Sequence, residues 1–212
     1  MISNTVKNKM PCELVAWDQF SSLVLELAHQ IRTSGIEVDM IVAIGRGGYM
    51  PARLLSDLLG IMNLASFKIE HYRGSLKSPQ AIIKYPLVAD VNRQNILLVD
   101  DVSDSGDTFN VAIDHINSKG TPQSIHSAVL HHNSVSKFVP EYFAQEVKQW
   151  RWIIYPWAVT EDLSVLISAM EPKPVDTKSI QEKLLEKHGI EPSLQQIQDA
   201  VSLIKEQNLD EQ

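Results

Sequence analysis

Apolar and polar residues along the 212-residue chain follow two different spacings. Between residues 17 and 32, apolar side chains recur at helical intervals, which predicts a helix with one buried face. Ser34 and Gly35 follow this helix as a stop signal. The same spacing predicts two further helices, over residues 51–59 and 109–116, with Gly60 and Gly120 as their stops.

Short apolar segments predict the strands. Two uninterrupted runs, at residues 41–44 and 95–100, are typical of strands with helices over both faces. Four more strands are predicted at residues 64–70, 81–87, 124–130 and 152–156. Because strands alternate with helices, we expect an α/β fold with an open, mainly parallel sheet flanked by helices. Ligands of such sheets usually bind beyond the carboxyl ends of the strands.

The composition changes near the end of the chain. Prolines in the segment EPKPVD indicate a linker, and two short apolar faces after it predict a helical hairpin. Ser193 and Gln196 match a capping box, and Gly189 separates the two helices. We therefore expect a main domain over residues 1–170 and a linker with a helical tail over 171–212. These faces are too short to form a core alone, so we expect the tail to pack on something and the protein to form a homo-oligomer.

Charge and composition narrow the class of function. Nineteen Lys and Arg against 26 Asp and Glu give a net charge of −7, which argues against a nucleic-acid-binding protein. No apolar run is long enough for a membrane span or a signal peptide. The single cysteine, Cys12, excludes an internal disulfide and fits a reducing compartment. We expect a cytoplasmic protein.

The segment NILLVDDVSDSGDTF, residues 95–109, places four aspartates after the most apolar predicted strand. Like charges repel one another, so this turn points to a bound ligand. A calcium loop counted from Asp101 would need glutamate at the twelfth position, where Ala112 stands. An aspartate nucleophile with a second carboxylate two positions on is excluded by Val102 and Ser103. The chain also lacks the Gly-Lys-Ser/Thr of a Walker loop.

Two binding roles remain inside this turn. Asp100 and Asp101 can accept hydrogen bonds from a sugar diol or hold a hydrated divalent cation. The segment DSGDT, residues 104–108, brings small residues and a glycine to a helix N-terminus, where backbone N–H groups and the helix dipole favour a phosphate. A diol beside a phosphate indicates a ribose 5-phosphate.

The same segment resembles the binding motif of type I phosphoribosyltransferases for 5-phosphoribosyl 1-diphosphate. The resemblance implies that Asp100 and Asp101 bind the ribose, with Asp101 also a ligand of Mg²⁺. It implies that Asp104 is the catalytic acid-base group at N7 of a purine. It also implies that the 5-phosphate is bound by Ser105, Gly106, Asp107 and Thr108.

Two other segments are similar to the xanthine-guanine and archaeal-type branch of this family. In AIGRGGYMPARLL, Arg46, Gly47 and Gly48 would hold the departing diphosphate, because arginine offers a fork of donors and glycine allows close approach. In WRWIIYPWAVTEDL, Trp152 would stack on the purine and the Ile153 backbone would read its edge. The family's loop carries a peptide bond that can be cis between arginine and glycine, here Arg46–Gly47.

One position departs from the family pattern. Xanthine-guanine enzymes usually carry a lysine followed by proline near the base, whereas this chain carries Asn133 and Ser134 there. An asparagine can donate or accept a hydrogen bond but is not charged. The base is therefore left open among hypoxanthine, guanine, xanthine and other purines.

The resemblance implies a purine phosphoribosyltransferase of nucleotide salvage, which uses Mg²⁺ and releases diphosphate. Closure of a mobile loop at Tyr72 to Ser78 would exclude water. An alternative is a catalytically weak regulator that binds phosphoribosyl diphosphate, and a third is a bare α/β interaction domain. Plain structural roles are also open: a helix cap for Asp104, a surface position for Arg46 and a core position for Trp152.

Overall fold

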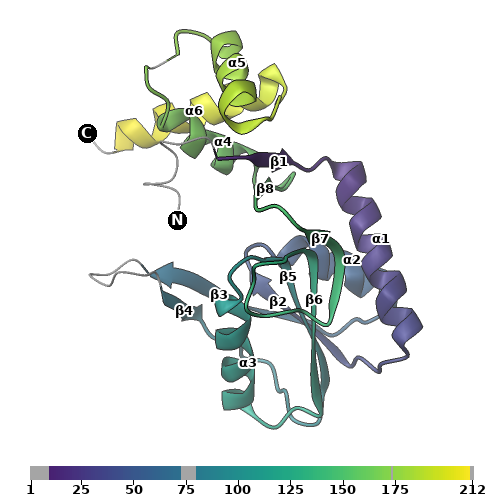
Figure 1. Ribbon diagram of the computed structural model, residues 1–212. Helices are drawn as coiled ribbons and strands as arrows, with labels where there is room; N and C mark the ends of the chain where they lie inside the picture. The colour runs from purple at the N-terminus through teal and green to yellow at the C-terminus, as the bar shows by residue number, and fades with distance from the viewer. Residues whose placement is uncertain (1–9, 73–79, 173, 211–212) are drawn as a thin grey trace. The chain divides into compact units, whose positions relative to one another are not determined.

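The computed structural model describes residues 10–72, 80–172 and 174–210 (Figure 1). The chain divides into two compact units. One unit is Ser21–Gln149, and the other joins the N-terminal segment up to Phe20 with the chain from Trp150 onward. The loop predicted at Tyr72 to Ser78 falls largely outside the described residues.

A mainly parallel sheet forms the centre of the unit Ser21–Gln149. Among the described residues its strand order is β4-β3-β2-β5-β6-β7. The strands are β2 (Met40–Gly45), β3 (Leu64–Tyr72), β4 (Gln80–Tyr85), β5 (Asn95–Ser103), β6 (Ser124–Asn133) and β7 (Tyr142–Val147). Only the β3–β4 pair is antiparallel in this order, so the predicted open, mainly parallel sheet is confirmed.

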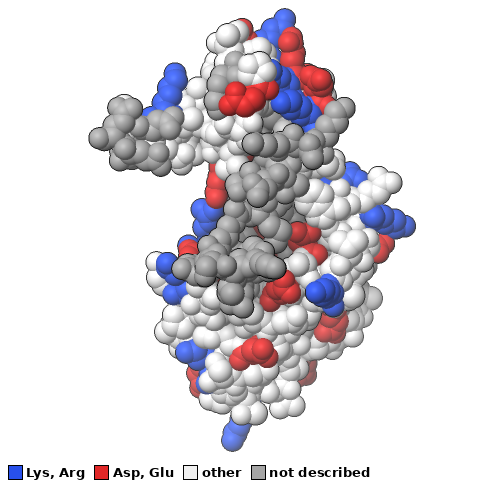
Figure 2. Space-filling model, turned by 60° about the vertical axis from the view of Figure 1, so that its left-hand side comes forward, with Lys and Arg blue, Asp and Glu red and all other residues white. Residues whose placement is uncertain are grey.

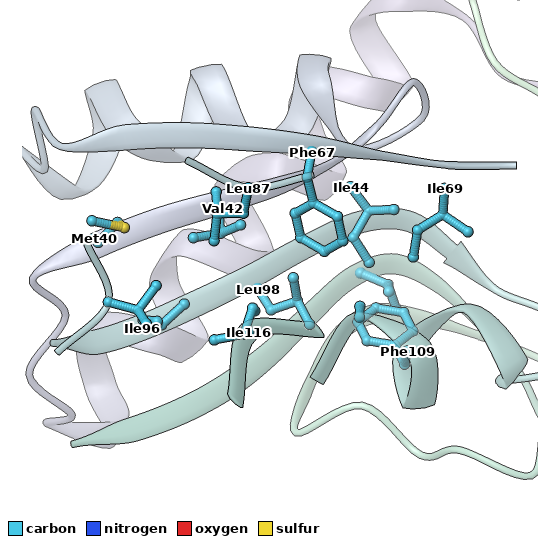
Figure 3. Close-up of a cluster of buried hydrophobic side chains, with 13 residues drawn as sticks. Met40, Val42, Ile44, Phe67, Ile69, Leu87, Ile96, Leu98, Phe109 and Ile116 are labelled. Atoms are coloured by element: carbon cyan, nitrogen blue, oxygen red, sulfur yellow. The ribbon is translucent and has the colours of Figure 1, made fainter. Parts of the chain in front are cut away.

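Both faces of the central strands are buried. Met40, Val42 and Ile44 of β2 lie in one hydrophobic cluster with Phe109 of helix α3 (Asp107–Lys119), as Figure 3 shows. The alternate residues of β2 are equally buried, and helix α2 (Tyr49–Leu59) contacts β2 and β5. Successive side chains of a strand point to opposite faces, so a strand covered on both sides reads as one continuous apolar run.

Glycines end the helices where the sequence placed stop signals. Helix α1 (Trp17–Ser34) is followed by Gly35 with φ of 74°. Helix α2 ends at Gly60, whose φ of 71° lies in the left-handed region that favours glycine. Both predicted stops are confirmed.

The second unit contains a separate two-stranded sheet. Strand β1 (Cys12–Leu14) pairs in parallel with β8 (Trp152–Ile154). The prediction that the segment at 152–156 extends the main sheet is therefore wrong. A three-residue strand such as β1 is too short to show a periodic pattern, and its pairing with a segment far along the chain decides where β8 lies.

The C-terminal helices belong to the core of this second unit. Helices α4 (Val159–Ser168), α5 (Thr177–His188) and α6 (Leu194–Asp210) contribute to one hydrophobic cluster with Met10 and Ile154. His188 is buried, and its Nδ1 lies 2.8 Å from the Met10 carbonyl oxygen. The tail therefore packs within its own chain, across the predicted boundary at residue 170.

Local signals in the tail are also confirmed. The Ser193 N–H donates to Gln196 Oε1 at 2.8 Å, and the Gln196 N–H donates to Ser193 Oγ at 3.2 Å, which completes the predicted capping box. Gly189 ends α5 with φ of 72°. The predicted homo-oligomer stays a prediction.

Two further features concern the charges on the surface and the length and composition of the helices. On the face shown in Figure 2, Lys and Arg side chains are interspersed with Asp and Glu side chains. Within the described ranges, no helix has both the length and the apolar composition needed to cross a membrane.

Two adjacent leucines of α5 allow a matched test of the packing in the core of the second unit. Leu184 is 0% exposed and Leu185 is 51% exposed. We expect Leu184→Ala to lower the free energy of unfolding by about 2–5 kcal/mol, because a buried leucine leaves a cavity. Leu185→Ala should change it by less than about 0.5 kcal/mol. Urea unfolding followed by circular dichroism measures both, and equal losses would show that α5 is not packed as described.

Candidate functional site

Two turns meet at the carboxyl ends of neighbouring strands. β2 runs into the turn Arg46–Gly48 and then α2, and β5 runs into the turn Asp104–Gly106 and then α3. β2 and β5 pair directly in parallel, with Ala43 opposite Val99. Adjacent parallel strands end at the same sheet edge, so both turns lie at one site, as the sequence predicted.

Backbone and carboxylate are in close contact where the turns meet. A Cβ atom added to Gly47 would lie 2.5 Å from Cγ of Asp101. A Cβ atom on Gly48 would lie 2.7 Å from the Ile44 carbonyl oxygen and would collide with the Val99 carbonyl oxygen. A side chain at Gly48 would displace backbone of the strand ends, and one at Gly47 would displace the Asp101 carboxylate.

The first turn contains a cis peptide bond between Gly45 and Arg46. The sequence resemblance pointed to the bond Arg46–Gly47, so the cis bond lies one residue earlier than that position. Arg46 is exposed, and the ring of Tyr49 lies over Gly45, where an added Cβ would be 2.6 Å from Cζ of Tyr49. The turn therefore presents an exposed arginine, while Gly47 lies against the Asp101 carboxylate and Gly48 is buried against the strand backbone.

Asp100 and Asp101 are consecutive residues at the end of β5. The Asp101 N–H donates to Asp100 Oδ1 at 2.9 Å, and the Gly48 N–H donates to the Ile44 carbonyl oxygen at 2.9 Å. Burial raises the pKa of Asp101 to about 6. Burial, together with the neighbouring Asp101 charge, raises the pKa of Asp100 well above its ordinary value.

Among the described residues no cluster of three or more His, Cys, Asp or Glu side chains could hold a metal ion, so Asp100 and Asp101 would supply only part of the ligands of a divalent cation. Burial makes a negative charge on either carboxylate unfavourable, and a bound cation would offset that cost. Carboxylate oxygens are also the ligands that Mg²⁺ prefers. Asp101 is the better placed ligand of the two, because it is half-buried whereas Asp100 is 9% exposed.

The second turn has the features of a phosphate cradle. Gly106 is the N-cap of α3, has φ of 87° and contributes no side-chain cap to the first turn of the helix. Ser105 Oγ donates to Asp107 Oδ2 at 3.1 Å and accepts from the Asp107 N–H at 3.3 Å. Thr108 follows in the first turn of α3. Backbone donors at a helix N-terminus bind anions even where carboxylates are near.

Asp104 and Asn133 are brought together by the fold. Asn133 ends β6 and is 3% exposed, and its Nδ2 donates to Asp104 Oδ1 at 3.0 Å. The two residues are 29 positions apart in the chain. The plain reading of Asp104 as the cap of α3 is wrong, because the N-cap is Gly106.

The loop after β6 contacts the phosphate turn, which the sequence did not predict. The Lys137 N–H donates to the Ser105 carbonyl oxygen at 3.2 Å, and Ser136 Oγ lies 3.0 Å from Ser103 Oγ. The ring of Phe138 stacks on Phe109 with centroids 4.8 Å apart. No sequence spacing marks these residues, since each contact joins segments far apart in the chain.

The proposed base-binding residues lie in the second unit. Trp152 is half-buried and packs against the core of that unit, and its Nε1 is buried with no hydrogen-bond partner in the described chain. The Trp152 N–H donates to the Pro11 carbonyl oxygen, and Ile154 O accepts from the Val15 N–H. The backbone groups of Ile153 therefore point to the opposite edge of the two-stranded sheet.

Comparison with known proteins identifies the family and the fold. The model of the phosphoribosyl transferase domain family matches residues 13–162, from β1 into α4. The chain belongs to the phosphoribosyltransferase family. The predicted type I phosphoribosyltransferase is thus confirmed, and helices α5 and α6 lie beyond the matched residues.

Individual relatives of this phosphoribosyltransferase support the same branch. It is 28% identical over 161 residues to the xanthine-guanine phosphoribosyltransferase of Cereibacter sphaeroides, which is 72% of this chain and 92% of the relative. A purine phosphoribosyltransferase from Pyrococcus horikoshii is 29% identical, with a TM-score of 0.61 over 69% of this chain and 93% of the other. A hypothetical protein from Neisseria gonorrhoeae with bound ppGpp is 28% identical, with a TM-score of 0.63 over 70% and 89%.

Two glycines with left-handed backbone conformations, Gly60 and Gly106, allow the effect of backbone strain to be measured apart from the effect of a steric clash. Gly60 has φ of 71° with nothing within 4 Å of an added Cβ, whereas at Gly106 that Cβ would lie 2.6 Å from Cβ of Phe138. We expect Gly60→Ala to cost about 1–2 kcal/mol of unfolding free energy from strain alone. Gly106→Ala should cost more and weaken binding of phosphoribosyl diphosphate at least about tenfold, since the cradle must shift. Thermal unfolding and calorimetry measure these effects, and equal stability losses with unchanged binding would contradict the described cradle.

The raised pKa of Asp101 predicts how stability depends on pH. The carboxyl of Asp101 has a pKa of about 6 in the folded protein and an ordinary pKa of about 4 in the unfolded chain. Between these two pH values the folded protein binds a proton that the unfolded chain has released. The free energy of unfolding therefore falls as pH rises through this window. Without Mg²⁺, Asp101→Asn should melt above the unsubstituted protein at pH 8 and close to it at pH 4. Mg²⁺ should raise the melting temperature of the unsubstituted protein more than that of the variant.

The exposed aspartate Asp114 on α3 serves as the control for this experiment. Asp114→Asn should leave both the pH profile and the Mg²⁺ response of the melting temperature unchanged. An Asp101→Asn protein that melts below the unsubstituted one at pH 8 would show that the carboxylate charge stabilises the fold instead.

Proposed function

We propose that this phosphoribosyltransferase transfers the 5-phosphoribosyl group from 5-phosphoribosyl 1-diphosphate to a purine base and releases diphosphate. The observation that carries the proposal is the contact of Gly47 with Asp101, which joins an arginine-glycine turn to a carboxylate pair and a phosphate cradle. A ribose with a phosphate at one end and a diphosphate at the other matches this order of donors and acceptors. The same chemistry would serve purine salvage.

Each part of the substrate has a chemically suitable partner in the proposal. Backbone N–H groups of residues 105–108 bind the 5-phosphate at the N-terminus of α3. Asp100 and Asp101 accept hydrogen bonds from the ribose hydroxyls. Arg46 donates to the diphosphate, and Gly47 and Gly48 let it approach the backbone closely.

The reaction breaks the bond between ribose carbon 1 and the diphosphate oxygen, and forms a bond from carbon 1 to a purine nitrogen. Positive charge develops on the ribose in the transition state, and the carboxylates of Asp100 and Asp101 stabilise it. Mg²⁺, held by Asp101, would supply charge that helps diphosphate depart. Asp104 accepts the proton that the purine loses at N7 as its other ring nitrogen bonds to carbon 1.

The family resemblance assigns the base to Trp152 and Ile153. The Trp152 indole would stack on the purine, and the Ile153 N–H and C=O groups, which point away from β1, would bind its edge. The relatives are named for xanthine and guanine, so 6-oxopurines are the first candidates.

The decisive experiment combines purified protein, Mg²⁺, phosphoribosyl diphosphate and a panel of hypoxanthine, guanine, xanthine and adenine. We expect nucleotide and diphosphate in equal amounts with at least one 6-oxopurine. Asp104→Asn should lower turnover about 100-fold or more, because proton transfer by a positioned group contributes this much. Asp114→Asn is the control, and unchanged turnover of Asp104→Asn would remove Asp104 from the acid-base role.

A regulatory role is the second candidate, favoured by the Neisseria gonorrhoeae neighbour with bound ppGpp. A nucleotide with two diphosphate groups presents the same kind of anions as phosphoribosyl diphosphate, so the two ligands would compete for one site. Binding of either ligand without conversion of any base would favour this second role over the enzymatic one.

A further inference from the structure

We infer that Asn133 is a positioning residue that acts on the base through Asp104, rather than a residue that contacts the base. The inference rests on the proposed function for its catalytic consequence, but the contact behind it is a feature of the fold. Its first support is the hydrogen bond of 3.0 Å from Asn133 Nδ2 to Asp104 Oδ1.

Both ends of the Asn133 amide are hydrogen-bonded inside the protein. While Nδ2 donates to Asp104, Oδ1 accepts from the Val135 N–H at 3.3 Å. The reverse orientation would set the amide oxygen against a carboxylate oxygen and the NH₂ group against an N–H, which is unfavourable on both sides. The orientation of the amide is therefore fixed, with its NH₂ group on Asp104 and its oxygen on the loop.

The backbone of Asn133 is held on both sides. It closes β6, with Val147 of β7 opposite, and the Ser134 N–H donates to the Val147 carbonyl oxygen at 3.1 Å. The Ser136 N–H donates to the Asn133 carbonyl oxygen at 2.9 Å. At 3% exposure the side chain has little freedom, so it can hold Asp104 at a fixed distance.

The loop after Asn133 holds the rest of the phosphate turn. The Lys137 N–H donates to the Ser105 carbonyl oxygen, and Phe138 fills the space beside Gly106. Asn133 is the side-chain link from this loop region to the proposed acid-base carboxylate. Asn133 thus forms a hydrogen bond with the Asp104 carboxylate, whereas the lysine usual in the family at this position is expected to contact the purine.

The two roles predict different kinetics. If Asn133 positions Asp104, Asn133→Leu should lower kcat about tenfold or more by the same factor for every base that reacts, with KM for phosphoribosyl diphosphate changed less than about threefold. If Asn133 contacts the base, the loss should depend on the substituent at purine carbon 6. A base-dependent loss, or turnover within about twofold of the unsubstituted protein, would overturn the inference.

Asn95 provides a matched control. Its Nδ2 donates to Asp39 Oδ2 at 2.8 Å, so it forms the same kind of pair at the amino end of β5. Asn95→Leu should keep kcat within about twofold even if it lowers the melting temperature, since it lies at the other end of the strand. Asn133→Ser, with a smaller side chain, replaces Asn133→Leu if the leucine variant does not fold, and the same kinetic result is expected.

A double-mutant cycle tests whether the effect passes through Asp104. In an Asp104→Asn background, Asn133→Leu should lower turnover little further, because the positioned carboxylate is already gone. Independent, multiplying losses would overturn the inference.

Melting temperatures test the contact between Asn133 and Asp104 without an activity measurement. The melting-temperature losses of Asn133→Leu and Asp104→Ala should be non-additive in the double variant, whereas additive losses would overturn the contact. A protein that converts no base would overturn the proposed function and the catalytic consequence, and this unfolding cycle would still support or refute the contact itself.

Discussion

The site depends on how closely two central strands approach each other at their carboxyl ends. β2 and β5 are direct parallel neighbours, and the turn that follows β2 lies against the end of β5. Gly47 lies against the Asp101 carboxylate, and Gly48 lies against the backbone of Val99. Any side chain at these two positions would push the turns apart. The sheet therefore decides the spacing between the arginine-glycine turn and the carboxylates before any ligand is bound.

The same constraint explains how an acidic site can bind an anionic substrate. The carboxylates of Asp100 and Asp101 are gathered at the strand end, where burial raises their pKa values and favours a cation or a hydroxyl-rich group. In the proposed function, phosphate groups are bound elsewhere, by backbone N–H groups at the N-terminus of α3 and by Arg46. The hydroxyl groups and the phosphate groups of one substrate would thus be bound by different atoms of neighbouring segments.

The loop after β6 supports the phosphate turn and Asp104 from outside the substrate-binding turns. Ser136, Lys137 and Phe138 contact the phosphate turn, and Asn133 holds Asp104. A loop between two strands of the main sheet thereby supports the cradle from behind. Ligand-binding groups on loops need such support, because loops alone are less rigid than strands or helices. The C-terminal helices give the second unit a comparable support, since α4, α5 and α6 share one core with β8.

The sequence by itself determined the elements with strong local signals: the continuous strands β2 and β5, the glycine stops of α1 and α2, the capping box at Ser193, and the two binding turns. Tertiary structure alone decided that β8 pairs with β1 outside the main sheet, and that Asn133 contacts Asp104. The reason is physical. Helix caps, turns and periodicity arise from neighbours in the chain, whereas strand partners and side-chain contacts join residues far apart, and no local pattern records them.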